Sequence, residues 1–213
     1  MSGSAQQIHV VMFDLGGVLV ELTGVPTMMG WLANRMSVEE LWSYWLTSPT
    51  VRAFERGHIA PELFADQIIL DMSLPVAREE FLLTFTNWVA GLYPGALELV
   101  NSLPVGLVRA TLANTSVLHW PRLMNDLGLE QLFDHHFPSH LTGRIKPDEE
   151  AFQHVLDTLG CQAGDVLFLD DNRLNVETAH NIGMHATCVR GPAEARQALA
   201  AAGIVKSDCA QRE

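Results

Sequence analysis

The sequence predicts an α/β protein: a Rossmann-like core with a parallel sheet covered by helices on both faces, and a small α-helical cap domain inserted into it. Two observations predict the core. Short apolar segments with loop-forming residues at their carboxyl ends occupy residues 8–14, 106–116, 165–172 and 185–191, and helical patterns separate the last three. Strands that alternate with helices of this length indicate a parallel sheet. A third observation predicts the cap, because residues 21–93 contain no convincing strand but four of the five tryptophans.

The helices of the core carry clear start and stop signals. Residues 147–160 begin with Pro and Asp, place glutamates in the first turn and end at a glycine. Residues 173–183 and 192–203 also end at a glycine. Residues 118–127 carry apolar residues at helical spacing, and residues 93–103 contain a Pro-Gly turn followed by a helix that returns the chain to the core.

The inserted segment is predicted to be a group of amphipathic helices. Ser37 opens one of them, with Glu40 three residues later at capping-box spacing, and residues 61–70 and 77–92 show further helical patterns. Large aromatic side chains are usually buried, so we interpret four tryptophans as the core of the insert rather than as a ligand site. They are Trp31, Trp42, Trp45 and Trp88. The predicted domains are a catalytic core of residues 1–20 and 94–213 and a cap of residues 21–93.

The composition narrows the class of protein. The formal net charge of −12 argues against a nucleic-acid partner, and any anionic substrate must be neutralised by a metal or by a few placed cations. The polar start of the chain lacks a signal-peptide pattern, and no stretch is apolar enough to span a membrane. Cys161, Cys188 and Cys209 fit no metal spacing and are interpreted as reduced thiols. We expect a cytoplasmic, soluble protein of undetermined oligomeric state.

Polar side chains follow the predicted strands at their carboxyl ends, where ligands bind in open parallel sheets. Asp14 follows the first strand, the run from Asn114 to Ser116 follows another, and Asp170 and Asp171 end a third. Each could serve as a helix cap if taken alone. Together, three converging carboxylates indicate a divalent cation, and oxygen ligands suit Mg²⁺.

Four motifs resemble those of the haloacid dehalogenase-like hydrolase superfamily, in the family's order. They are Asp14 in FDLGGVL, Asn114 in LANTS, Lys146 in GRIKPD, and the segment FLDDNRLNVETAHNIG at residues 168–183. The insert lies where the family carries its helical cap, and the resemblance covers nearly the whole chain. Within the superfamily, the chain is most similar to bacterial phosphatases that resemble alpha-D-glucose-1-phosphatase. The resemblance implies a phosphatase acting on a small phosphorylated metabolite, with sugar phosphates as the first choice.

The resemblance also implies a role for each motif residue. Asp14 would attack phosphorus and form an aspartyl-phosphate, and a carboxylate can do so without an assisting base. Mg²⁺ would be held by Asp14, the carbonyl of Gly16, and Asp170 or Asp171.

The phosphate would be bound by the second and third motifs. Thr115 and the backbone amides beside Asn114 would cradle the phosphoryl oxygens. Lys146 would offset their charge in the transition state, although most lysines are solvated surface residues.

Two positions depart from the family pattern. Gly16 stands where most phosphatases of this superfamily carry a second aspartate that acts as general acid and base. Ala113 replaces the usual hydroxyl residue of the second motif. The sequence therefore leaves two alternatives open: a catalytically weakened phosphate-binding or regulatory protein, and a 2-haloacid dehalogenase. The pair Asp170–Asp171 favours a metal, and therefore phosphate, over a dehalogenase that needs no Mg²⁺.

Substrate choice in this family is assigned to the cap. Its segment at residues 48–60 is expected to face the site, with Arg52, Glu55 and Arg56 as candidate contacts. The alternative for each is a solvated surface charge.

Overall fold

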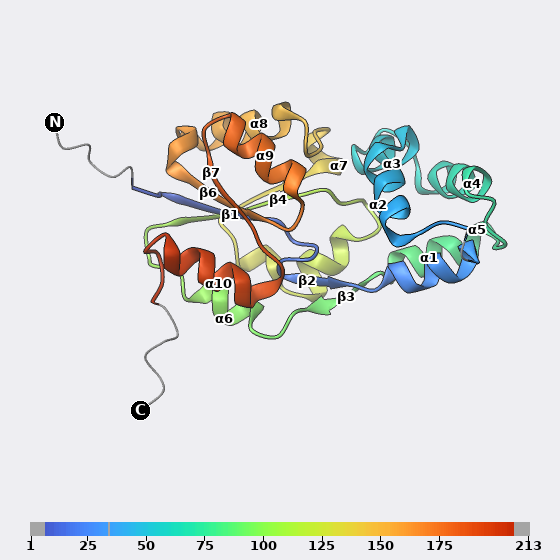
Figure 1. The fold of residues 1–213 in the computed structure, drawn as a ribbon, viewed down its shortest axis with the longest axis horizontal. Coiled ribbons are helices and arrows are strands. Elements are labelled where there is room, and N and C mark those ends of the chain that lie inside the picture. Colours follow the sequence, from blue (N-terminus) through green and yellow to red (C-terminus); the bar gives the residue numbers. More distant parts are fainter. Residues whose placement is uncertain (1–6, 34, 207–213) are drawn as a thin grey trace.

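The computed structural model describes residues 7–33 and 35–206, and within them the core is a five-stranded parallel sheet in the order β5-β4-β1-β6-β7 (Figure 1). The strands are β1 (Val10–Phe13), β4 (Val108–Ala113), β5 (His135–Pro138), β6 (Val166–Asp170) and β7 (His185–Cys188). β1 lies in the middle, paired with β4 on one side and β6 on the other. The carboxyl ends of these three strands therefore meet at one edge of the sheet, and the predicted α/β class is confirmed.

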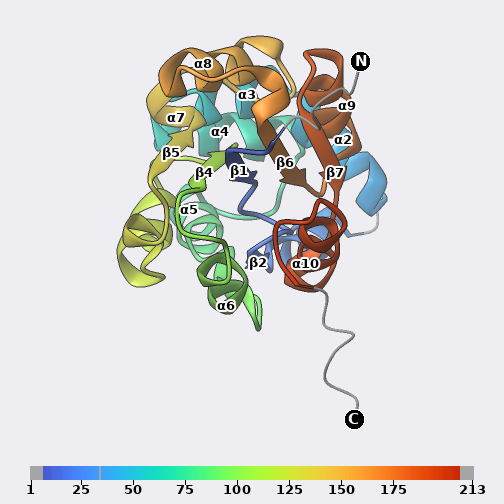
Figure 2. The same cartoon turned by 90° about the vertical axis from the view of Figure 1, so that its left-hand side faces the viewer.

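Each face of the sheet has its own apolar core. Val11 and Phe13 of β1 pack with side chains of α6 (Ala96–Asn101) and α10 (Gly191–Ala201). Val10 and Met12 point to the other face and pack with side chains of α8 (Glu149–Leu159) and α9 (Arg173–Asn181). Figures 1 and 2 show these two helix pairs on opposite sides of the sheet. Because both faces are covered, β1 is apolar at every position, as central parallel strands usually are.

The cap packs around a separate apolar core that includes the rings of Phe54 and Phe64, stacked with centroids 4.1 Å apart. Its helices are α1 (Gly24–Leu32), α2 (Val38–Thr47), α3 (Pro49–Glu55), α4 (Pro61–Asp71) and α5 (Arg78–Thr86). The predicted capping box of Ser37 and Glu40 is present at the start of α2. The division into a core of residues 1–20 and 94–213 and a cap of residues 21–93 stays a prediction.

The interpretation of the cap tryptophans is right for three of the four. Trp31, Trp45 and Trp88 pack against the apolar core of the cap. Trp42 is 47% exposed, so its interpretation as a core residue is wrong. The reason is its position on α2, one residue after the buried Leu41, which turns its side chain towards solvent.

An antiparallel strand pair joins the core to the cap, although the sequence pattern predicts no strand between residues 21 and 93. β2 (Val20–Leu22) pairs with β3 (Val89–Leu92). The helix predicted over residues 77–92 accordingly ends at Thr86. Strands of three or four residues are too short to show a period of two. The two strands hydrogen-bond to each other, and the side chain of Arg122 donates to the carbonyls of Val89 and Ala90 at 2.6 and 2.8 Å.

Two segments of the core also differ from the sequence expectation. β5 is absent from the predicted strands because its sequence, HHFP, buries only its last two residues. The helix predicted over residues 118–127 covers only residues 120–126 and ends in a π-helical turn. Pro121 suits the first turn of a helix but not its interior, which explains the late start.

Cys161 and Cys188 are free thiols, as predicted, while Cys209 and the polar N-terminal residues 1–6 lie outside the described residues. Within the described ranges, no helix has the length and apolar character needed to cross a bilayer.

Candidate active site

The three predicted carboxylates meet at the carboxyl edge of the sheet. Asp14 directly follows β1, Asp170 ends β6, and Asp171 comes next. The amide of Asp14 donates to the carbonyl of Leu169 at 2.8 Å, which keeps β1 paired with β6 up to the site. One carboxylate oxygen from each aspartate lies within 4.8 Å of the others. The sheet therefore brings together side chains that are 156 positions apart in the case of Asp14 and Asp170.

Lys146 places a cation between two of these carboxylates. Its Nζ lies 2.8 Å from Oδ1 of Asp14 and 2.6 Å from Oδ2 of Asp170, and its side chain is 2% exposed. Burial alone would lower the pKa of Lys146, but the charges of Asp14 and Asp170 outweigh it and raise the pKa above its usual value. The ammonium therefore stays protonated, and the interpretation of Lys146 as a solvated surface residue is excluded by its burial.

Asn114 fixes the backbone of Lys146. Its Nδ2 donates to the carbonyl of Lys146, and its Oδ1 accepts the amide of Lys146, both at 2.9 Å. These two bonds tie the loop that carries Lys146 to the end of β4. They use the Oδ1 and one N–H of the Nδ2 of Asn114.

Two buried hydroxyls follow Asn114. The Oγ1 of Thr115 and the Oγ of Ser116 have no hydrogen-bond partner. The backbone of Thr115 is held by Ser139, whose Oγ accepts the amide and donates to the carbonyl, both at 3.0 Å. A buried hydroxyl without a partner costs about 1–3 kcal/mol, so these two groups are suited to a ligand oxygen. Ser139 is a site residue that sequence reasoning missed, because it follows the unpredicted strand β5.

Asp170 is held rigidly by the start of α9. Its Oδ1 accepts the amide of Asn172 at 2.7 Å, and Nδ2 of Asn175 lies 3.0 and 2.9 Å from its two oxygens. Asp170 itself is 0% exposed. Asn175 was missed as a site residue, although it lies in the fourth motif, five positions after Asp170. Its position in the first turn of the helix that follows Asp170 was the signal available in the sequence.

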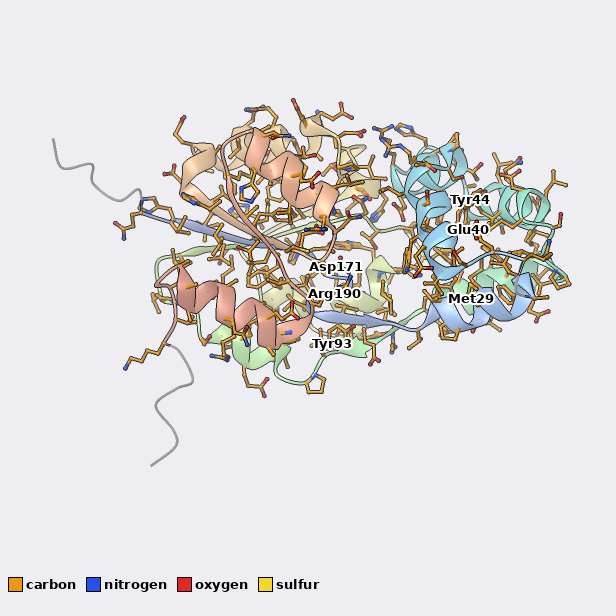
Figure 3. The ribbon with its side chains drawn as sticks, in the orientation of Figure 1. Met29, Glu40, Tyr44, Tyr93, Asp171 and Arg190 are labelled. Atoms are coloured by element: carbon orange, nitrogen blue, oxygen red, sulfur yellow. The ribbon has the colours of Figure 1, made fainter. Side chains whose placement is uncertain are left out.

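Asp171 faces a cavity of about 280 Å³ that is also lined by Gly17, Tyr93 and Arg190. Figure 3 shows Asp171 and Arg190 at the edge of the core that faces the cap. Gly17 has a φ of 73°, and a Cβ at this position would collide with Oδ2 of Asp171. The second glycine of the pair is therefore required by both backbone conformation and close approach.

Gly16 provides no side chain two positions after Asp14. An added Cβ would meet Cδ1 of Leu22 at 3.0 Å, and Leu22 is 42% exposed and can move. The carbonyl of Gly16 as a metal ligand stays a prediction. Ala113, which is 3% exposed, ends β4 without a hydroxyl, so the polar groups of the second motif begin at Asn114.

The charges at the site do not balance. Burial raises the pKa of Asp14 to about 7, with Lys146 acting against this and with Asp170 and Asp171 adding to it. Burial and the charge of Asp170 also raise the pKa of Asp171. Three carboxylates therefore share one ammonium, that of Lys146. Their oxygen atoms are hard donors that lie within 4.8 Å of one another. This donor set fits a divalent cation such as Mg²⁺.

The cap contacts the core beside Lys146. Arg52 of α3 reaches both oxygens of Asp148, with Nη2 at 2.8 and 2.6 Å, and Arg56 pairs with the same carboxylate and with Glu150. Arg52 and Arg56 thus join the two domains instead of being solvated charges. Glu55 lies between them in sequence and accepts a hydrogen bond from Nε1 of Trp45 at 3.3 Å.

The fold and the site together define an α/β enzyme with an acidic, cation-binding active site under a helical cap. Residues 8–183 match the family described as haloacid dehalogenase-like hydrolase, and the chain belongs to this family. The predicted family is therefore confirmed, and so is the prediction of a hydrolase.

Two relatives are phosphatases. The chain is 30% identical over 175 residues to the sesquiterpene phosphatase astK of Aspergillus oryzae. This match covers 81% of this chain and 85% of that protein. It is 29% identical over 209 residues to a phosphatase of Mycobacterium tuberculosis, covering 90% of this chain and 92% of that protein. These relatives support the predicted class of activity, hydrolysis of phosphate esters.

A solved structure shares the fold. It is a family enzyme from Bacteroides thetaiotaomicron in complex with magnesium and inorganic phosphate. The TM-score is 0.69 at 23% identity, over 86% of this chain and 94% of that one.

Proposed function

We propose that the protein is a Mg²⁺-dependent phosphatase that hydrolyses a small phosphorylated metabolite through an aspartyl-phosphate on Asp14. The observation that carries the proposal is the convergence of three carboxylates and one buried ammonium at the end of β1. A carboxylate nucleophile at a strand end, next to a cation, is suited to attack on phosphorus because it needs no deprotonation by a base once ionised.

Asp14, Asp170 and Asp171 would hold Mg²⁺, with the carbonyl of Gly16 as a further ligand. When bound, the cation neutralises charge on the phosphate and orients it. Asn175 and the amide of Asn172 keep the carboxylate of Asp170 in place for this role.

The remaining roles belong to residues of the chain itself. Lys146 stabilises the negative charge that develops on the transferred phosphoryl group, and Asn114 positions Lys146 through its backbone. The hydroxyls of Thr115 and Ser116, which have no partner in the protein, donate to phosphoryl oxygens.

Two substrate classes follow from different observations. The resemblance to alpha-D-glucose-1-phosphatase-like enzymes favours a sugar phosphate. A cavity of about 410 Å³ between cap and core favours an apolar ester instead, because Phe54, Ile59, Val117 and Leu141 are among its lining residues. Val117 directly follows the Asn114–Ser116 segment in the chain, which supports a substrate that reaches from the proposed phosphate site towards this cavity. The sesquiterpene phosphatase among the relatives supports a prenyl phosphate as the apolar candidate.

The test is phosphate release from a panel of sugar and prenyl phosphates, with Mg²⁺ and with excess chelator. We expect turnover only with Mg²⁺, and loss of at least a hundredfold in Asp14→Asn, whose amide is nearly isosteric but cannot act as the nucleophile. Asp157→Asn, an exposed aspartate of α8, is the matched control and should keep wild-type activity.

Three outcomes would contradict the proposal. Turnover that persists in chelator argues against a metal mechanism, and release of halide from 2-haloacids under the same conditions would support the dehalogenase alternative. Binding of phosphate without turnover of any ester in the panel would support a regulatory protein.

A further inference from the structure

We propose that Glu55 of the cap is the general acid and base of this active site, taking the part for which Gly16 provides no carboxylate. The inference deepens the proposed phosphatase function and rests on it. The cap would then contribute a catalytic residue in addition to its expected role in substrate choice.

The face of α3 that carries Glu55 is seated on the core next to Lys146. Arg52 and Arg56, three positions before and one after Glu55, both pair with Asp148, which lies two residues beyond Lys146. Gly57, with a φ of 72°, lets the cap backbone approach the carbonyl of His140, where any Cβ would collide. These contacts fix the end of α3 against the catalytic edge of the sheet.

The carboxylate of Glu55 is not used in the ion pairs that hold α3 to the core. Among the described residues it accepts one hydrogen bond, from Trp45, and forms no ion pair with the neighbouring arginines, whose partners are Asp148 and Glu150. The charge of Lys146 nevertheless reaches it. Lys146 itself lies 2.8 Å from Asp14, so the proposal places an ester at Asp14 between Lys146 and Glu55. A phosphate ester held at Asp14 would lie within the same charge cluster.

The environment of Glu55 suits proton transfer near neutral pH. The residue keeps some accessible surface, yet its carboxylate is surrounded by protein. The resulting loss of hydration raises the pKa of Glu55 to about 7, while the hydrogen bond from Trp45 and the charges of Lys146 and Arg52 act in the opposite direction. A group with a pKa near the working pH can both give and accept a proton.

Each step balances with one carboxyl group. In the first, Asp14 forms a bond to phosphorus, the bond from phosphorus to the ester oxygen breaks, and protonated Glu55 gives its proton to that oxygen, releasing an alcohol. In the second, the carboxylate of Glu55 takes a proton from water, the water oxygen bonds to phosphorus, and the bond to Asp14 breaks. Inorganic phosphate leaves, and both side chains return to their starting forms.

The experiment compares two esters with Mg²⁺ present in wild type and Glu55→Gln. Glutamine keeps the shape and the acceptor for Trp45 but cannot exchange the proton. Turnover of propyl phosphate, whose leaving group needs a proton, should fall by about 10²–10⁴-fold. With 4-nitrophenyl phosphate, whose leaving group is stable as an anion, the rapid burst of nitrophenolate should stay within about threefold of wild type, followed by a slowed steady state. Glu62→Gln, an exposed glutamate of α4, should change neither ester.

The burst shows whether Glu55→Gln still folds and whether Asp14 still reacts. Equal losses for both esters, burst included, would assign Glu55 a structural role and overturn the inference. Unchanged turnover of propyl phosphate would also overturn it, while leaving the proposed phosphatase function intact. A wild-type protein with no Mg²⁺-dependent turnover of either ester would overturn both.

Discussion

Lys146 provides the most quantitative test of the site, because it is the buried cation between Asp14 and Asp170. Lys146→Met keeps the length and apolar stem of the side chain but removes the charge. Removing one partner of a buried ion pair typically costs about 3–5 kcal/mol, since the remaining charge is left without compensation. Burial already raises the pKa of Asp14 to about 7. This carboxylate can therefore take up a proton and relieve part of the cost, so we expect the lower half of that range.

The assay is thermal and urea unfolding of the metal-free protein at neutral pH. For a chain of 213 residues, each kcal/mol lowers Tm by about 2–4 °C, so the predicted loss corresponds to roughly 6–16 °C. Lys206→Met alters the other lysine of the chain, which is exposed, and should leave Tm unchanged. Mg²⁺ should return part of the lost stability, because it supplies positive charge to the same carboxylates.

A loss below about 1 kcal/mol in Lys146→Met would refute the reasoning, since that is the range of exposed ion pairs. Activity provides a second readout. Loss of one group that stabilises the transition-state charge typically lowers kcat by about 10²–10³-fold. A variant with normal kcat would show that Lys146 does not face the transferred phosphoryl group.

Four further predictions concern the surroundings of the site. Gly17→Ala should weaken Mg²⁺ binding at least tenfold, measured by calorimetry, because its Cβ displaces Asp171; unchanged affinity would exclude Asp171 as a ligand. Gly16→Asp should raise turnover of alkyl phosphates more in Glu55→Gln than in wild type. The measurement is turnover against the pKa of the leaving group. Equal gains in both backgrounds would show that Asp at position 16 and Glu55 do not share a role. Asp148→Asn should raise KM more than it lowers kcat, since it loosens the cap, and its KM should depend less on salt than the KM of wild type. Burial raises the pKa of Glu55 above its unfolded value, so Glu55 alone should contribute a loss of up to about 3 kcal/mol of stability as pH rises from 5 to 8, and Glu55→Gln should lose less than wild type in urea unfolding.

The sequence by itself determined the alternation of β1, β4, β6 and β7 with helices and the polar residues at the ends of β1, β4 and β6. Two patterns are local: the apolar run of β1 is followed by Asp14, and the apolar run of β6 ends in the pair Asp170–Asp171. The parallel sheet places these two patterns side by side. The capping box of α2 and the glycine after α8 are equally local. Such signals depend on a few neighbouring residues, which explains why they could be interpreted without the fold.

Tertiary structure decided the features that depend on partners far apart in the chain. β2 and β3 are strands because each pairs with the other across the whole cap, and β5 is a strand because β4 lies beside it. The use of the Asn114 side chain to hold Lys146 depends on a contact between residues 32 positions apart. The ion pair of Arg52 with Asp148, which holds the cap to the core, spans 96 positions. These arrangements depend on contacts between segments that are far apart in the chain, which no local pattern encodes.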